Sequence, residues 1–532
     1  MSRIRNWFDD HPFAKGTTNF FLVVLSLAAI ALSLLLKNTT LFYGGIAALL
    51  ACIFRPGSAL HKPTMESWNI GKFLICILVL AVTILACIIP MGHLSLWNGQ
   101  QPGHRNQYEL MAEAILDGRV DFAYGDEDTL ANLENPYDPE ERKEAGIFYH
   151  WDHAYYKGHY YMYFGVVPVF LVFLPYRVLT GTSLTTYHAT QIFAALTIVG
   201  IFILFYMLAK LFFKKLPVSV YLALSVAFSV ISIWYSIAEP ALYCTAITAA
   251  LALEVWSIYF FVKAVWGKTR ENVQLAYAAI GALCGALSFG CRPPIALANI
   301  LVLPMLVVFL KQRKFSLKLL GKLVLVALPY ALVALGLMYY NYIRFENPFE
   351  FGQAYQLTVA DQHLYKVTLD TPTLVRIINE SKQNFFGTRD ITTTFPYIRT
   401  SSLFFNFPIF FLIFAFFKKK VFVEMKKKTI LSLVIGLVFC AIVITAIDIM
   451  WTPYLLERYR MDIYFLMGIA SFTVIGFWYS NSLAKRQKFF SAFMVFAALL
   501  TIVSAFLFYV RTVGAYYPHV PADVARNLSL KP

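Results

Sequence analysis

Apolar residues fall in long blocks along this chain of 532 residues, and short polar segments separate the blocks. Each long block, such as 73–91, 192–211 or 492–510, can cross about 30 Å of hydrocarbon as a helix. In lipid every backbone amide needs a partner within its own segment, so these blocks are predicted to be helices. The alternating short strands of a transmembrane barrel do not occur in the pattern.

The block pattern predicts an all-α polytopic membrane protein with about 13 transmembrane helices. The expected spans lie at about 18–36, 40–54, 73–91, 188–210, 217–238, 242–264, 273–290, 294–310, 321–341, 403–418, 429–449, 460–479 and 489–510. Two long polar stretches interrupt them and are predicted to be extracytoplasmic loops that carry juxtamembrane helices.

Composition and charge support this interpretation. Hydrophobic residues make up 59% of the chain and charged residues only 14%, a ratio that excludes an ordinary soluble domain. A formal net charge of +15 would suggest a nucleic-acid partner in a soluble protein, but here the basic residues gather in short loops between spans. We therefore expect membrane lipids and no nucleic acid as partners. The seven cysteines contain no CxxC pair and are expected to be buried small hydrophobic residues.

The basic loops set the orientation. They lie at 55–72, 210–215, 263–270, 311–322, 418–428 and 485–488. The positive-inside rule puts these loops and the N-terminus in the cytoplasm. This holds only if the short block 166–174, which contains Pro168 and is followed by Pro175, lies along or dips into the outer face without crossing. The expected location is a plasma (inner) membrane.

The expected organisation has six parts. They are N-terminal transmembrane helices at 1–91, a first extracytoplasmic loop at 92–187, a central bundle at 188–341, a second extracytoplasmic loop at 342–402, C-terminal helices at 403–510 and an extracytoplasmic tail at 511–532.

The first outer loop carries the most informative residues. Apolar side chains from Tyr108 to Leu116 recur at helical spacing and predict an amphipathic helix on the membrane surface. The loop closes with the segment 151–165, which begins Trp151-Asp152-His153 and interleaves charges with aromatic rings. Rings stack on the apolar face of a sugar and carboxylates accept its hydroxyl hydrogens, so this composition suits a sugar ligand.

The order of these motifs resembles the GT-C superfamily of membrane glycosyltransferases, over about residues 73–480. The features are the surface helix, the segment 152–165, Glu239 at the outer end of a span, the segment 341–352 and the segment 457–462. The nearest branches are the protein O-mannosyltransferase-like enzymes and the lipid A aminoarabinose transferases. The resemblance implies an enzyme that uses polyprenyl-phosphate sugars at the outer face.

One departure bears on the catalytic residue. Such enzymes usually have an Asp just before the surface helix, where this chain has His104-Arg105-Asn106-Gln107. Asp152 is therefore the first candidate for the base, with Glu109 and Glu239 as further catalytic candidates. Arginine binds phosphate in bidentate fashion, and the phosphate-binding candidates are Arg105, Arg292, Arg344, Arg458 and Arg460. The substrate-binding candidates are Tyr108, Trp151, Tyr155, Tyr156, Tyr459 and Asp462.

The predicted function is an inverting glycosyltransferase that moves a sugar from a polyprenyl-phosphate donor to a cell-surface glycan, lipid or protein acceptor. The alternatives are a transporter or flippase of lipid-linked sugars, and a non-catalytic subunit of a glycan-assembly complex. A transporter should have charges at mid-membrane, where this chain has only Glu254. No cofactor is expected, although His150, His153 and His159 near Asp152 leave a divalent metal open.

Overall fold

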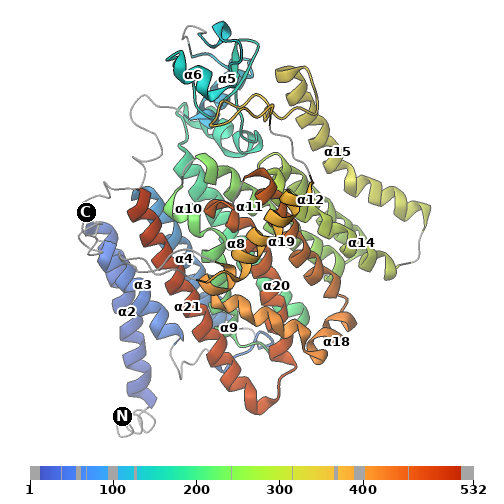
Figure 1. Ribbon diagram of the computed structural model, residues 1–532. Helices are drawn as coiled ribbons and strands as arrows, with labels where there is room; N and C mark the ends of the chain where they lie inside the picture. Colours follow the sequence, from blue (N-terminus) through green and yellow to red (C-terminus); the bar gives the residue numbers. More distant parts are fainter. Residues whose placement is uncertain are drawn as a thin grey trace.

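The computed structural model describes residues 12–36, 39–54, 61–67, 69–93, 106–124, 129–240, 242–313, 316–364, 369–388, 402–452 and 455–516. These residues form a helical bundle with a small lobe at one end, where α5 and α6 lie (Figure 1).

Nine segments of the described chain are long and apolar enough to cross a membrane. They are α4 (Ile70–His93), α8 (Thr186–Phe212), α11 (Leu242–Trp266), α12 (Glu271–Phe289), the run of α13 (Pro293–Ala296), η5 (Leu297–Leu301) and α14 (Val302–Lys311), α15 (Leu317–Phe345), α19 (Leu431–Trp451), α20 (Arg460–Ser480) and α21 (Ala484–Tyr516). The prediction of an all-α polytopic membrane protein is confirmed, but the count of 13 spans is not. The other four expected spans are shorter apolar stretches in α2 (Pro12–Leu36), α3 (Thr39–Phe54), α9 (Val218–Ser232) and η6 (Pro408–Phe417).

The span expected at 403–418 departs most from the prediction. It consists of α17 (Leu403–Asn406) and the ten-residue 3₁₀ helix η6. Pro408 lacks an amide hydrogen and disfavours helical geometry at Phe407, whose φ of −130° and ψ of 84° break the helix. A 3₁₀ helix rises about 2 Å per residue, so η6 extends over about 20 Å.

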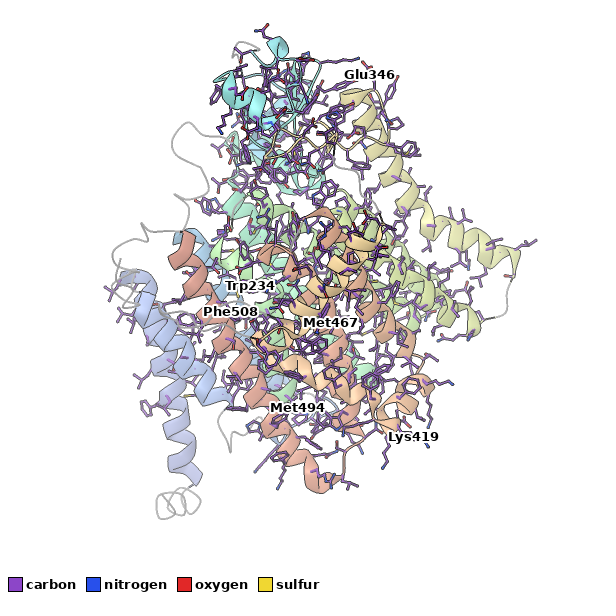
Figure 2. All side chains as sticks on the ribbon, viewed as in Figure 1. Trp234, Glu346, Lys419, Met467, Met494 and Phe508 are labelled. Atoms are coloured by element: carbon purple, nitrogen blue, oxygen red, sulfur yellow. The ribbon has the colours of Figure 1, made fainter. Side chains whose placement is uncertain are left out.

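The bundle packs around α20, in which every residue from Met461 to Phe477 is buried. Phe472 of α20 stacks on Phe205 of α8 with ring centroids 3.8 Å apart. Gly468 and Gly476 lie directly against the rings of Phe228 and Phe213, so these small residues let the neighbouring helices approach closely. Figure 2 shows Met467 of α20 inside the bundle.

The lobe is built from the two long loops together. It holds α5 (Gln107–Leu116), η3 (Leu130–Asn132), α6 (Pro139–Glu144) and an antiparallel sheet of order β1–β3–β2, with strands Asp121–Phe122, His159–Tyr161 and Ala154–Tyr156. Segment 355–358 of the second loop joins this sheet, and Tyr155 donates its amide to Tyr355. The sheet was not predicted, because strands of two or three residues leave no alternating pattern. The second loop also carries α16 (Thr371–Phe386).

The block 166–174 becomes the five-residue π segment η4 (Val169–Phe173) and the short helix α7 (Leu174–Thr180). These 12 residues extend about 18 Å at 1.5 Å per residue, too short to cross a bilayer. Gly181, with φ 71°, ends α7, and the Thr185 side chain caps α8 four residues later. Tyr108 of α5 stacks on Phe173, so the block packs beneath the lobe as a juxtamembrane helix.

The basic loops lie together at the opposite end of the bundle. Segment 61–67 pairs with the turn between α8 and α9, where Met65 donates its amide to Leu216 over 3.0 Å. The indole of Trp266, at the end of α11, donates to Thr429 before α19. The bundle therefore has a basic end at these loops and an aromatic, acidic end at the lobe.

Candidate active site

Asp152 has a left-handed backbone conformation, with φ 57°, that non-glycine residues seldom adopt. Hydrogen bonds fix it on each side. Its amide donates to Leu357 over 3.0 Å, and the Gln107 side chain donates to its carbonyl over 2.8 Å. His153 donates from Nδ1 to the Trp151 carbonyl and accepts from the Tyr124 hydroxyl at Nε2, which fixes its tautomer. The surrounding lobe therefore holds Asp152 in a conformation that it would not adopt alone.

The Asp152 carboxylate is buried and accepts hydrogen bonds from two other elements. Gln356 of the second loop donates to Oδ1 over 2.9 Å, and the Tyr243 hydroxyl, at the start of α11, donates to Oδ2. Burial raises the carboxyl pKa to about 6, while Gln356 and the Arg458 charge act in the opposite direction. A carboxylate with this pKa can both hold and release a proton near neutral pH.

The helix α5 is tied to Asp152 through the residues that replace the expected Asp. Asn106 caps α5 by accepting from the amides of Tyr108 and Glu109, and its Nδ2 donates to the Glu109 carboxylate over 2.7 Å. Gln107 accepts from the Tyr163 amide while it donates to Asp152. Glu109 is therefore buried at the start of α5, beside the residue that holds Asp152.

Two arginines flank the Tyr459 ring at the start of α20. The Arg292 guanidinium carbon lies 4.2 Å from the ring centroid and that of Arg458 lies 5.2 Å from it. Arg292 is neutralised by Asp462 at 2.9 Å and Asp448 at 3.6 Å.

Arg458 differs from Arg292 in its charge balance. It stacks at 4.5 Å over Tyr243, the residue that donates to Asp152. Within the described part of the chain it forms no ion pair, and its buried Nε has no hydrogen-bond acceptor. This cation is therefore the best placed to receive an anionic ligand next to Asp152.

Glu239 follows the short helix α10 (Trp234–Ala238) and is partly buried. Burial raises its pKa, while a hydrogen bond from Tyr235 and the charge of Arg458 lower it. Arg458 thus acts on both Asp152 and Glu239, and the three predicted residues belong to one electrostatic site.

Several predicted site residues have structural roles. Arg344 is buried and donates to the Met162 carbonyl and to Asn341, so it holds the first loop on α15. Few of its N–H donors remain to bind a phosphate. Tyr108 and Tyr155 are buried in packing contacts, which places neither ring where a sugar could stack. Asp462 is fully buried and acts through Arg292.

The remaining candidates lie nearer the surface. Trp151, next to Asp152, is 47% exposed and available for stacking. Tyr156 is partly buried against Tyr355, with centroids 4.6 Å apart. Arg460 begins α20 next to Tyr464, and Arg105 lies outside the described residues. Within those residues, no three His, Cys, Asp or Glu side chains lie close enough together to hold a metal ion.

Three residues at the site were not among the predicted ones: Tyr243, Gln356 and Gln107. Tyr243 lies in the motif that contains Glu239, so the sequence could have identified it as a site residue. No sequence pattern links Gln356 to the site, because it lies 204 residues from Asp152 in the chain.

No family model matches this sequence, and no curated protein matches it. Three solved structures of an oligosaccharyltransferase from the archaeon Archaeoglobus fulgidus are similar to this chain. One, in complex with an inhibitory peptide and a dolichol-phosphate, is 13% identical with a TM-score of 0.44, and the match covers 87% of this chain and 60% of the other. The apo form has 12% identity, a TM-score of 0.40 and coverages of 85% and 60%.

The third structure, tethered to an acceptor peptide, has 12% identity, a TM-score of 0.39 and coverages of 82% and 55%. This chain therefore matches less than two thirds of each oligosaccharyltransferase. Likeness at this distance assigns no residue roles, which rest on the geometry above.

Proposed function

We propose that this protein is a membrane glycosyltransferase that moves a sugar from a polyprenyl-phosphate carrier to an acceptor hydroxyl at the lobe end of the bundle. The observation that carries the proposal is Asp152, a buried carboxylate held in a strained conformation with a pKa of about 6 beside Arg458. Strained residues of this kind concentrate at functional sites, since the surrounding structure must stabilise them.

The proposed reaction is a single displacement at the anomeric carbon. Asp152 takes the proton of the acceptor group as that group forms its bond to the carbon. The bond from the carbon to the phosphate oxygen breaks, and its electron pair leaves with the lipid phosphate. Arg458 stabilises the charge on the departing phosphate, since a preorganised cation acts where negative charge develops. One displacement inverts the anomeric configuration.

Arg292 and Tyr459 set the geometry of the phosphate site. Asp448 and Asp462 hold Arg292 in place, and its guanidinium supports one face of the Tyr459 ring. Arg458 lies by the same ring and turns towards Tyr243. The donor phosphate is expected at Arg458, and the sugar is expected near the exposed Trp151 ring, on which it can stack.

A transporter of lipid-linked sugars is the second candidate function. It would place charged groups deep in the bundle, where Glu254 lies buried in the middle of α11. That carboxylate accepts hydrogen bonds from Ser288 and Asn299, and Tyr330 donates to Asn299, so four helical segments share one polar contact. Such a network stabilises helix packing, which leaves the site at the lobe as the better candidate for function.

Complementation of a strain that lacks this protein tests the proposal. The strain receives the wild type, Asp152→Asn or Arg458→Gln, membrane levels are matched, and surface glycans are profiled by mass spectrometry. We expect the null strain to lack one sugar, and neither variant to restore it. Arg344→Gln, at a buried structural arginine, tests whether any arginine loss has the same effect, provided that it accumulates normally.

Full restoration of the glycan by Asp152→Asn would overturn the catalytic assignment and favour a transport or scaffold role. A null strain with an unchanged glycan profile would overturn the proposed function as a whole.

A further inference from the structure

The basic end of the bundle carries a helix whose charge exceeds what packing requires. Helix α18 (Lys419–Lys427) follows η6 and packs against α19 and α20. Val421 and Met425, four residues apart, are buried against the bundle and fix one face of α18. The other faces of α18 are therefore free to meet the surroundings.

Those faces are strongly basic. Six lysines lie in or beside α18 and all are exposed: Lys418, Lys419, Lys420, Lys426, Lys427 and Lys428. Glu424 is the one acidic residue among them, and its contact with Lys427 is 4.0 Å long. An exposed pair at this distance is weak, so it neutralises little of the charge.

The level of α18 relative to the membrane follows from two tryptophans. Lys418 lies 5.3 Å from the Trp478 ring near the end of α20, and Trp266, at the end of α11, donates to Thr429 just after α18. Tryptophan at the ends of spans marks the membrane–water boundary. Figure 2 places Lys419 at the end of the molecule opposite Glu346, which lies beside the lobe.

Apolar side chains are exposed next to the lysines. Phe417 is 78% exposed and Val423 is 49% exposed, and Phe422 lies between them in sequence. A short helix with a basic face and exposed aromatic and aliphatic side chains, lying at the boundary, is typical of a helix that rests on the membrane surface.

We propose that α18 and its flanks, residues 417–428, form a binding site for anionic phospholipids. The apolar side chains enter the acyl region and the six lysines contact the phosphate groups of several headgroups. A lysine run that served only to orient the chain during insertion would require charge but neither the exposed Phe417 and Val423 nor a helix fixed at the boundary. The site is independent of the chemistry at Asp152.

Native mass spectrometry of the full-length protein in an uncharged detergent tests the site. The protein is titrated with phosphatidylglycerol and with phosphatidylcholine of the same acyl chains. We expect the wild type to retain phosphatidylglycerol at least about fivefold better. Replacing all six lysines by Gln should remove the preference, and replacing them by Arg should keep it. Should the full Gln set not accumulate, a triple Gln variant at Lys426, Lys427 and Lys428 should lose part of the preference.

The proposal is overturned if the wild type shows no preference between the two lipids, or if the Gln variant keeps it. Glycerophosphoglycerol, the soluble headgroup, should not displace bound lipid; displacement at equal concentration would assign the site to free phosphate compounds. Retention of a soluble acidic protein in place of the lipid would likewise overturn it.

Discussion

At the scale of single residues, Asp152 combines two conditions that oppose stability. Its left-handed backbone costs about 1 kcal/mol or more, and its carboxyl group is buried with a pKa of about 6. Gln107 of α5 and the neighbouring residues Gln356 and Leu357 of the second loop hold it in place with hydrogen bonds from two segments. The lobe thus stabilises a residue that would be more stable elsewhere, which is the pattern expected of a reacting group.

The stability of the protein should depend on pH through Asp152. Its pKa is 3.8 unperturbed and about 6 in the fold, so the unfolded chain ionises first as pH rises. The wild type therefore loses stability between these values, by a total on the order of 3 kcal/mol. Asp152→Asn has no carboxyl group to ionise at this position, so its stability should not fall in this way.

Thermal unfolding in detergent at pH 4 and pH 7.5 checks this. The unfolding temperature of Asp152→Asn minus that of the wild type should be larger at pH 7.5 than at pH 4. A constant difference would show that Asp152 ionises with an ordinary pKa.

Tyr243 is expected to position the Asp152 carboxylate and to lower its pKa. Tyr243→Phe keeps the ring over which Arg458 stacks but removes the donor to the carboxylate. Losing a hydrogen bond to a charged group costs about 1.5 kcal/mol or more, so transfer should slow at least about tenfold. The pKa of Asp152 should rise, and the acid limb of the rate profile should move to higher pH.

The pH profile separates positioning from simple loss of structure. A variant that was only less stable would lose rate without moving the acid limb. Tyr243→Leu, which also removes the ring beneath Arg458, should lose more activity than Tyr243→Phe.

Sequence predicted part of this site. Asp152, Glu239, Arg292 and Arg458 lie near the expected ends of spans, so the hydropathy pattern predicts that all four lie on the same side of the membrane. Which arginine is free did not follow, because the difference between Arg458 and Arg292 lies in the contacts of Arg292 with Asp448 and Asp462. Side-chain pairing between distant segments leaves no local signal.

At the scale of elements, hydropathy placed the long helices well. The expected spans 188–210 and 429–449 are α8 and α19, each within three residues at every end. Block length is a reliable signal because the bilayer thickness fixes the helix length. Hydropathy does not report backbone hydrogen-bond register, so it could not distinguish the 3₁₀ helix η6 from an α-helix, nor the π segment η4 from a regular turn.

The first loop contacts the turn before α13 so closely that a side chain at Gly165 should not fit. A methyl group on Gly165 would lie 2.3 Å from the Gly290 carbonyl oxygen and 2.5 Å from that of Cys291. Both are backbone atoms next to Arg292, so Gly165→Ala must shift one segment. We expect a loss of about 2 kcal/mol in stability and a matching loss of transfer activity.

Gly336→Ala in α15 is the matched control, since nothing lies within 4 Å of the added methyl group. It should be neutral or slightly stabilising, because Ala favours a helix over Gly. Equal unfolding temperatures for Gly165→Ala and Gly336→Ala would contradict the close contact.

At the scale of the whole molecule, Arg142 joins the two outer loops into one lobe. It is almost fully buried, donates to the carbonyls of Pro136 and Thr358 and stacks on Tyr149. Arg142→Met keeps much of the volume but leaves both carbonyls without a donor. Amide exchange in segment 353–358 should accelerate and activity should fall, because Gln356 reaches Asp152 from that segment.

Lys143→Met is the control for Arg142→Met, since the Lys143 side chain is 78% exposed. It should leave both exchange and activity near the wild-type values. Unchanged exchange in Arg142→Met would mean that the loops hold together without this residue.

The orientation of the whole molecule decides which donor the site can use. If the lobe faces outward, as the basic loops predict, cytoplasmic nucleotide sugars cannot reach Asp152 and a lipid-linked donor is required. Single cysteines report this directly, because Lys143 in the lobe and Lys427 in α18 are both strongly exposed at opposite ends. In a background without the seven native cysteines, a membrane-impermeant maleimide added to intact cells should label Lys143→Cys and not Lys427→Cys. Permeabilised cells should show both labelled, and the reverse pattern in intact cells would place Asp152 in the cytoplasm, where a nucleotide sugar would become the expected donor.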